Sequence, residues 1–111
     1  MAKYLLIESR DPYQHADARS LYTIADDLAK AGNAVTVFLV QNGVLPARRN
    51  AKDSPLDGLR SNAQGITVLA DDFSLKERAI SADRLADDVK PVPIEDLVDL
   101  LAEPGTKAIW H

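Results

Sequence analysis

The chain has 111 residues, of which 46% are hydrophobic and 27% charged, so its composition is that of an ordinary folded domain and excludes a disordered or fibrous protein. Its length predicts a single domain over residues 1–111, large enough to bury one core. The formal net charge of −4 argues against a nucleic-acid-binding protein, and no apolar stretch approaches the length of a membrane span, so we expect a cytoplasmic protein with no nucleic-acid or membrane partner.

The first part of the sequence predicts a strand, a helix and a second strand. Residues 3–8, "KYLLIE", form an apolar run with little alternation, which is typical of a strand covered on both faces. Apolar residues at three- and four-residue spacing predict a helix over 15–31, and Gly32 and Asn33 favour its end. "AVTVFLV", residues 34–40, is rich in β-branched residues and predicts a second buried strand. A strand–helix–strand unit of this length implies two parallel strands.

The middle of the chain predicts a long connection and a third strand. Residues 41–65 contain several glycines and prolines, so we expect a loop with one short helix over 54–63. "ITVLA", residues 66–70, predicts the third strand. The short helix "FSLKERAI" follows, and we expect the carboxylate of Asp72 to cap it, because aspartate accepts hydrogen bonds from the free amides of a first turn.

The last part predicts a polar connector, a helix and a final strand. "SADRLADDVKPVP", residues 81–93, is the connector, and Pro93 opens the helix at a position that proline favours. The apolar stripe of this helix consists of Ile94, Leu97, Val98 and Leu101. "KAIW", residues 107–110, predicts the final strand, in which we expect Trp110 to pack in the core or in a subunit contact.

Strands and helices alternate through the whole chain. The predicted fold is therefore an α/β protein, a three-layer α/β/α sandwich with a mostly parallel four- to five-stranded sheet. In such folds ligands bind beyond the carboxyl ends of the strands. The segments expected to meet there are residues 9–13, 41–49 and 70–74.

Two adjacent acids stand at one of these strand ends. Asp71 and Asp72, with Glu8 and Asp11 from the first loop, form a candidate acidic pocket for a divalent cation such as Mg²⁺. A phosphoryl-accepting domain would place its acid pair after the first strand and a lysine near a later one, and neither is present. We favour the simpler interpretation, in which one acid caps the helix and the other is solvated.

The remaining polar residues favour structural roles. His15 has no serine or cysteine nucleophile in a recognisable motif beside it, so we expect a surface or interface residue rather than a general base. Arg48, Arg49 and Lys52 are the nearest approach to a basic run, and we expect them to lie on a solvated loop rather than to bind an anion. His111 is the last residue, and we expect it to be frayed.

Three stretches of the sequence together resemble a known family. "LLIESRDPYQHADARSLYTIADDLAKAGNAVTVFLVQNGVLPAR", "GITVLADDFSLKERAI" and "VPIEDLVDLLAEPGTKAIWH" are similar, in order and spacing, to segments of the DsrE/DsrF-like (TusD-like) sulfur-relay proteins. The resemblance covers nearly the whole chain and implies one domain with the DsrEFH-like fold. It also implies homo-oligomers, such as trimers or hexamers, and a thiol-bearing sulfur-relay protein as a partner.

The resemblance places an important difference at Asp71. Active members of the family carry a persulfide on a cysteine at the end of the third strand, and that position falls on Asp71 here. The sequence contains no cysteine, and a carboxylate cannot accept or pass on sulfane sulfur, which requires a thiolate. We therefore expect a protein that is not itself a persulfide carrier, with no catalytic residue, no metal ligand and no cofactor.

Two functions remain open at this stage. In the first, the protein is a non-catalytic component whose role is assembly or partner binding. In the second, it binds a small ligand or metal in the pocket at the carboxyl ends of the strands. The candidate pocket residues are Asp71, Asp72, Arg10, Asp11, Tyr13, Asn42, Gly43 and Arg48.

Overall fold

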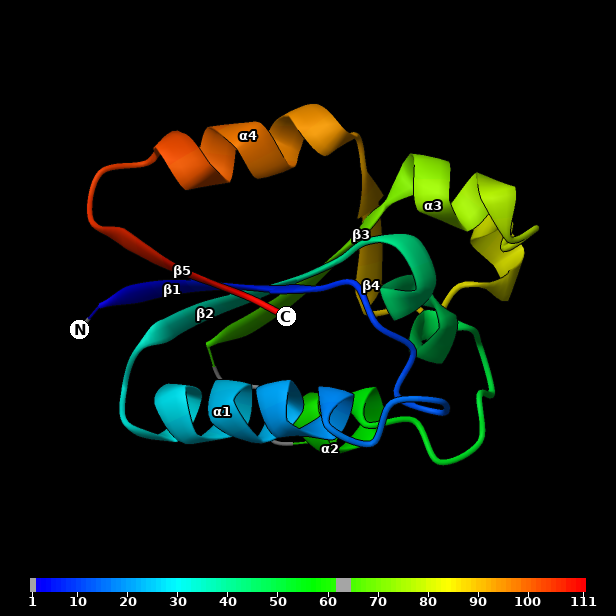
Figure 1. The fold of residues 1–111 in the computed structure, drawn as a ribbon, viewed down its shortest axis with the longest axis horizontal. Helices are drawn as coiled ribbons and strands as arrows, with labels where there is room; N and C mark the ends of the chain where they lie inside the picture. Colours follow the sequence, from blue (N-terminus) through cyan, green and yellow to red (C-terminus); the bar gives the residue numbers. More distant parts are fainter. Residues whose placement is uncertain (1, 62–64) are drawn as a thin grey trace.

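The computed structural model describes residues 2–61 and 65–111 and contains a sheet of five parallel strands in the order β4-β3-β2-β1-β5 (Figure 1). The strands are β1 (Lys3–Glu8), β2 (Ala34–Leu39), β3 (Ile66–Asp71), β4 (Val89–Val92) and β5 (Thr106–Trp110). The α-helices are α1 (Ala18–Lys30), α2 (Leu56–Ser61), α3 (Asp72–Glu77) and α4 (Ile94–Ala102). Two 3₁₀ helices, η1 (Gln41–Ala47) and η2 (Ala82–Arg84), complete the elements.

Helices cover both faces of the sheet. Figure 1 shows α1 and α2 on one face, α4 on the other, and α3 beyond the strand ends. The inner strand β1 contacts both helix layers, because its side chains alternate: Leu6 packs in the core beneath α1, whereas Leu5 and Ile7 pack beneath α4. The predicted three-layer α/β/α sandwich is confirmed, and the sheet is wholly parallel.

The fourth strand was not predicted. Residues 81–93, expected to be a polar connector, contain η2 and the strand β4. Among the described residues β4 pairs with β3 alone, and it includes Pro91. Proline is tolerated there because an edge strand has one side without ladder hydrogen bonds.

Some predicted helix boundaries also changed. The first helix begins at Ala18 rather than at residue 15. The loop predicted over residues 41–65 begins with the 3₁₀ helix η1, residues 41–47. The short helix predicted over 54–63 is α2, residues 56–61, and positions 62 and 63 of that prediction lie outside the described residues.

The apolar stripe predicted for α4 does not face the core as a whole. Only Leu97 is buried, whereas Ile94, Val98 and Leu101 are 44%, 61% and 46% exposed. Trp110 on β5 is 64% exposed, which excludes a core position within this chain. No helix among the described residues has the length and apolar content needed to cross a membrane.

Gly43 determines how closely η1 packs against the end of β1. A Cβ atom at this position would lie 2.2 Å from the carbonyl oxygen of Glu8, which is far inside contact distance. The obstacle is backbone at the end of a buried strand, so no side-chain rotation can relieve it. Only glycine allows η1 to lie this close to β1.

We therefore expect Gly43→Ala to destabilise the protein by about 2–4 kcal/mol, the range of strongly strained core substitutions. Gly32→Ala is the comparison, because Gly32 has a φ of +90° but an open environment, and it should cost only about 1 kcal/mol. Urea unfolding of the two variants measures the difference. Equal losses would show that η1 moves freely away from β1.

Candidate functional site

The carboxyl end of β1 is organised around Glu8, whose side chain is fully buried. Its two carboxylate oxygens lie 2.9 and 3.0 Å from Nδ1 of His111, and Oε2 accepts a hydrogen bond from the amide of Arg10. The backbone of His111 adds to this link, because its amide donates to Ile7 and its carbonyl accepts from Ser9. The expected fraying of His111 is wrong: this residue ties β5 to the end of β1.

Tyr22, on α1, places a buried hydroxyl in the same region. The residue is 4% exposed, and no described residue accepts a hydrogen bond from its hydroxyl. Burial raises the pKa of Tyr22 well above its ordinary value of 10.0, and the nearby carboxylate of Glu8 raises it further. The hydroxyl therefore stays protonated in the folded protein across the range in which an exposed tyrosine ionises.

This pKa shift predicts a loss of stability in alkaline solution. Above pH 10 the unfolded chain releases the Tyr22 proton while the folded chain keeps it, so stability should fall by about 1.4 kcal/mol per pH unit from this group. Tyr22→Phe should remove this contribution and, because it deletes a hydroxyl without a partner, should leave stability at pH 7 unchanged or slightly increased. Thermal unfolding of the wild-type protein and of Tyr22→Phe from pH 7 to pH 11 measures how the stability of each depends on pH. Parallel pH profiles would contradict the burial of the hydroxyl.

At the end of β3, Asp71 caps α3. Its Oδ2 accepts hydrogen bonds from the backbone amide of Ser74 at 3.1 Å and from the Ser74 hydroxyl at 2.7 Å. The Ser74 hydroxyl in turn accepts a hydrogen bond from the backbone amide of Gln41. The backbone of Gln41 has a φ of 52°, in the left-handed region. The expected cap, Asp72, is instead the first residue of the helix. Asp71 thus joins β3, α3 and η1 in one hydrogen-bond network, of which Asp71 and Ser74 are buried.

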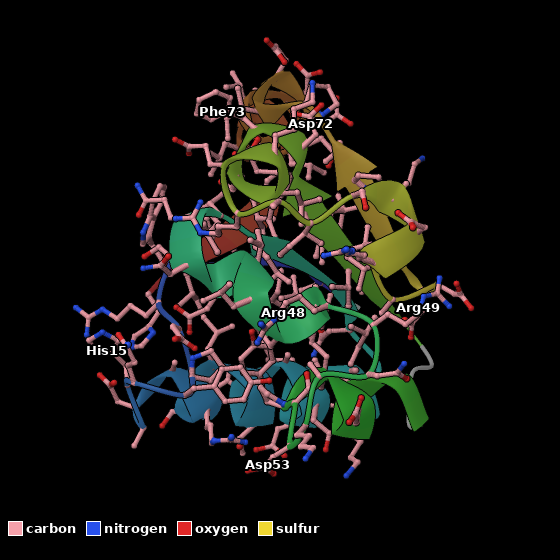
Figure 2. All side chains as sticks on the ribbon, turned by 90° about the vertical axis from the view of Figure 1, so that its right-hand side faces the viewer. His15, Arg48, Arg49, Asp53, Asp72 and Phe73 are labelled. Atoms are coloured by element: carbon pink, nitrogen blue, oxygen red, sulfur yellow. The ribbon has the colours of Figure 1, made fainter. Side chains whose placement is uncertain are left out.

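The second carboxylate oxygen of Asp71 differs from the first in its hydrogen bonding. The residue is 6% exposed, and Oδ1 is buried with no hydrogen-bond partner among the described residues. Asp72 is only partly buried, and Figure 2 shows it at the outer end of the molecule, well away from His15. The two adjacent acids therefore have separate roles: one is structural and buried, and the other is close to solvent.

Substitutions should distinguish the two acids. Asp71→Ala removes both bonds to Ser74 and should cost about 1–2 kcal/mol, whereas Asp71→Asn keeps an acceptor oxygen and should cost less. Asp72→Ala is the matched control and should stay within about 0.5 kcal/mol, apart from a small dipole effect. Chemical denaturation measures all three. A larger loss for Asp72→Ala than for Asp71→Ala would reverse the assignment of the cap.

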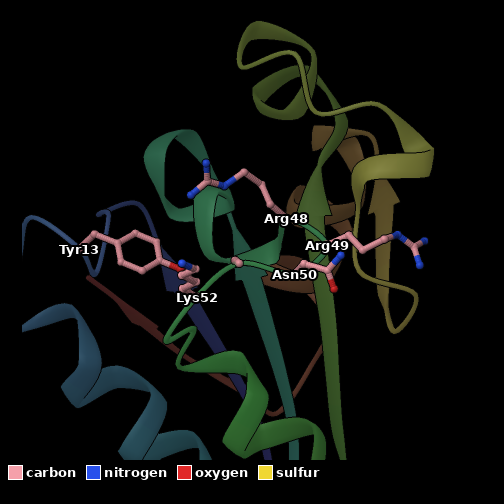
Figure 3. Close-up of a pocket in the computed structure, with 6 residues that line it drawn as sticks. Tyr13, Arg48, Arg49, Asn50 and Lys52 are labelled. Carbon is pink, nitrogen blue, oxygen red and sulfur yellow. The ribbon is translucent and has the colours of Figure 1, made fainter.

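A pocket of about 440 Å³ lies between the loop after β1 and the segment after η1 (Figure 3). Its lining residues are Tyr13, Arg48, Arg49, Asn50, Ala51 and Lys52. Two of them, Tyr13 and Arg48, were predicted for the pocket at the strand ends. They come from the loop after β1 and from the segment after η1, which the parallel topology brings to the same edge of the sheet.

The other predicted pocket residues make different contacts. Asp11 is buried and accepts from the amide of Tyr13, while Arg10 pairs with Asp17 at 3.4 Å. Asn42 accepts from the guanidinium of Arg78. Neither these residues nor Gly43, Asp71 and Asp72 line the pocket of Figure 3.

The acids near the strand ends do not gather around one point. Glu8 is engaged by His111, and Asp71 by Ser74. Across residues 2–61 and 65–111, no group of three or more histidine, cysteine or acidic side chains is placed to hold a metal ion. The geometry of the described residues therefore gives no support to the acidic pocket for a divalent cation.

Comparisons with known proteins agree with this architecture. The sequence profile of the DsrE/DsrF-like family matches residues 2–110. The crystal structure of the ychN protein from E. coli superposes with a TM-score of 0.82 at 18% identity, covering 98% of this chain and 100% of that chain. MTH1491 from Methanobacterium thermoautotrophicum, described as a protein of unknown function, superposes with a TM-score of 0.81 at 19% identity and full coverage of both chains. No curated protein matches the sequence.

Proposed function

The chain belongs to the DsrE/DsrF-like family, and from this premise we propose that it is a non-catalytic component that assembles with copies of itself and serves intracellular sulfur trafficking. The resemblance seen in the sequence is confirmed for the family and for the fold. The observation that carries the proposal is a combination: a sequence without a thiol and an exposed apolar surface on an otherwise complete fold.

The chemistry of sulfur transfer requires a thiolate. A persulfide forms on cysteine sulfur, and none of the 111 residues is cysteine. In the proposal, Asp71 stands where active relatives keep their cysteine. Its position supports this, because it is the last residue of β3 and the cap of α3. Its carboxylate holds Ser74 and thereby preserves the shape of the site without its usual reaction.

The exposed apolar surface lies over α4 and β5. We call it the α4–β5 face and define it by Ile94, Val98, Leu101 and Trp110. On the helix, one flank carries Asp96 and Asp99, which line a pocket together with Leu69 of β3. The three apolar residues occupy the opposite flank, at the spacing of one helix side.

Trp110 extends this surface onto the sheet. It pairs in register with Ile7, whose side chain packs under α4, so its indole points to the same side of the sheet. β5 itself pairs only with β1 and is an edge strand. Figure 2 shows Phe73, which is 63% exposed, projecting from α3 to the side away from Arg49.

The occupant that we propose for the α4–β5 face is a second copy of this chain. The residues that define the face are large, apolar and exposed, which favours an apolar surface as their partner. Interfaces between identical subunits are the more apolar class, and a two-fold contact places the same patch on both sides. A hexamer would combine this two-fold contact with a second, heterologous contact, whereas a trimer would consist of heterologous contacts alone.

The proposed setting is the cytoplasm, where cysteine thiols of a sulfur-relay partner stay reduced. In this proposal the partner supplies the thiol, and the present chain supplies a binding surface. The partner would then carry out the sulfur chemistry, and the present chain would hold the complex together.

Native mass spectrometry and light scattering test the assembly. We expect the wild-type protein to be oligomeric at tens of micromolar and Val98→Asp to shift it toward monomer, because a charge desolvated in an apolar contact is costly. The matched control is Ile24→Asp, since Ile24 is a comparably apolar side chain, 41% exposed, on α1 and so on the opposite face.

Thermal unfolding should show that both variants are folded, because both positions are exposed. A monomeric wild-type protein at these concentrations would overturn the proposal. The proposed contact would also be overturned if Ile24→Asp dissociated the oligomer and Val98→Asp did not, because the subunit contact would then lie on the α1 face.

A further inference from the structure

Positive charge is concentrated at one pocket of a protein whose formal net charge is −4. The pocket of Figure 3 is lined by Arg48, Arg49 and Lys52, together with Tyr13 and Asn50, and none of its lining residues is acidic. Such a local reversal of sign in an acidic domain makes the pocket a favourable place for an anion.

Arg48 is held in a defined position. Its backbone pairs with Leu85 in an antiparallel bridge, and the flanking amides of Arg49 and Ala86 donate to the carbonyls of Arg84 and Ala47. Its Nε donates to the carbonyl of Leu45 at 2.9 Å, which orients the guanidinium plane. Among the described residues nothing accepts from its two terminal nitrogens, so these donors are available to a ligand.

Lys52 and Tyr13 complete the pocket from the other side. No described residue pairs with the Lys52 ammonium or accepts from the Tyr13 hydroxyl, and Tyr13 is 40% exposed. Figure 3 shows the Tyr13 ring directed toward Lys52, with the Arg48 guanidinium on the same side of the loop. Three groups with free donors therefore come together from two segments of the chain.

Arg49 differs from its neighbour although it lines the same pocket. Its guanidinium donates to the Asp83 carbonyl at 3.1 Å and to the Asp87 carboxylate at 2.7 Å. Figure 3 shows this side chain extending away from Tyr13 and Lys52. Its charge is already compensated, so it contributes little to the field inside the pocket.

We propose that this pocket binds a small oxyanion through the Arg48 guanidinium, the Lys52 ammonium and the Tyr13 hydroxyl. A guanidinium presents a planar fork that matches two oxygens of such a group, and an ammonium supplies a compact charge to a third. The volume of about 440 Å³ exceeds that of an inorganic anion alone. The oxyanion therefore has space to carry an organic group against the Tyr13 ring.

Titration calorimetry with four probes tests this inference: phosphate, sulfate, thiosulfate and phenyl phosphate, each at constant ionic strength set with sodium chloride. We expect saturable one-site binding of at least one probe. Tighter binding of phenyl phosphate than of phosphate would identify a phosphate ester as the ligand class, whereas preference for sulfate or thiosulfate would identify a free sulfur oxyanion.

Variants then locate the site. Arg48→Gln and Lys52→Gln should each weaken binding about tenfold or more, as expected for loss of a charge-assisted contact. Arg49→Gln removes the same charge from the next residue and should change affinity no more than about threefold, since an exposed paired charge acts only through a screened field. Thermal unfolding checks that all three variants are folded.

Two results would overturn the inference. One is no saturable binding of any of the four probes at millimolar concentration. The other is an equal loss in Arg48→Gln and Arg49→Gln, which would indicate a diffuse positive surface without a site. The inference does not depend on the proposed assembly, because the α4–β5 face shares no residue with this pocket, and native mass spectrometry of Arg48→Gln should give the wild-type oligomer.

Discussion

The structure depends on the way the inner strand β1 ends. At Glu8 the main-chain carbonyl accepts the Val40 amide and leaves no space for a side chain on Gly43, while the buried carboxylate holds His111. One residue thereby fixes η1 on one side of β1 and the end of β5 on the other. A buried carboxylate with several donors is stable where an unpaired one would be expensive. The arrangement of the segments at the carboxyl ends of the strands, where the pocket lies, therefore depends on Glu8.

Most of the fold could be predicted from the sequence because its central elements carry strong, local signals. The apolar runs of β1, β2 and β3 and the apolar periodicity of α1 can be recognised within each segment alone. Most of the apolar residues that form these patterns are buried in the structure. β4 was not predicted because it has only four residues, includes the charged Lys90 and is interrupted by Pro91, a pattern that favours a connector. It becomes a strand only because β3 offers a free edge.

The candidate site could be predicted by region but not in its contacts. Parallel topology made it certain that the loop after β1 and the segment after β2 would meet, and Tyr13 and Arg48 do share a pocket. The acid that caps α3 depends on the residue at which the helix begins, and a sequence pattern does not fix that residue to within one position. The helix begins at Asp72, so Asp71 is the cap. The link between Glu8 and His111 joins positions at opposite ends of the sequence, and only the register of β5 against β1 brings them together. A buried acid at the end of an apolar strand was the one available signal.

The sheet has a property that follows from its strand order. β4 and β5 are consecutive in the chain, joined by α4, and yet they form the two opposite edges of the sheet. Residues 89–110 therefore supply both outer strands of a sheet whose three inner strands come from residues 3–71. Without this segment β3 and β1 would present open backbone to any strand nearby, including the same segment of another copy. Exchange of this closing segment between two chains would complete both sheets without a new contact, so the connectivity itself offers a route to a dimer.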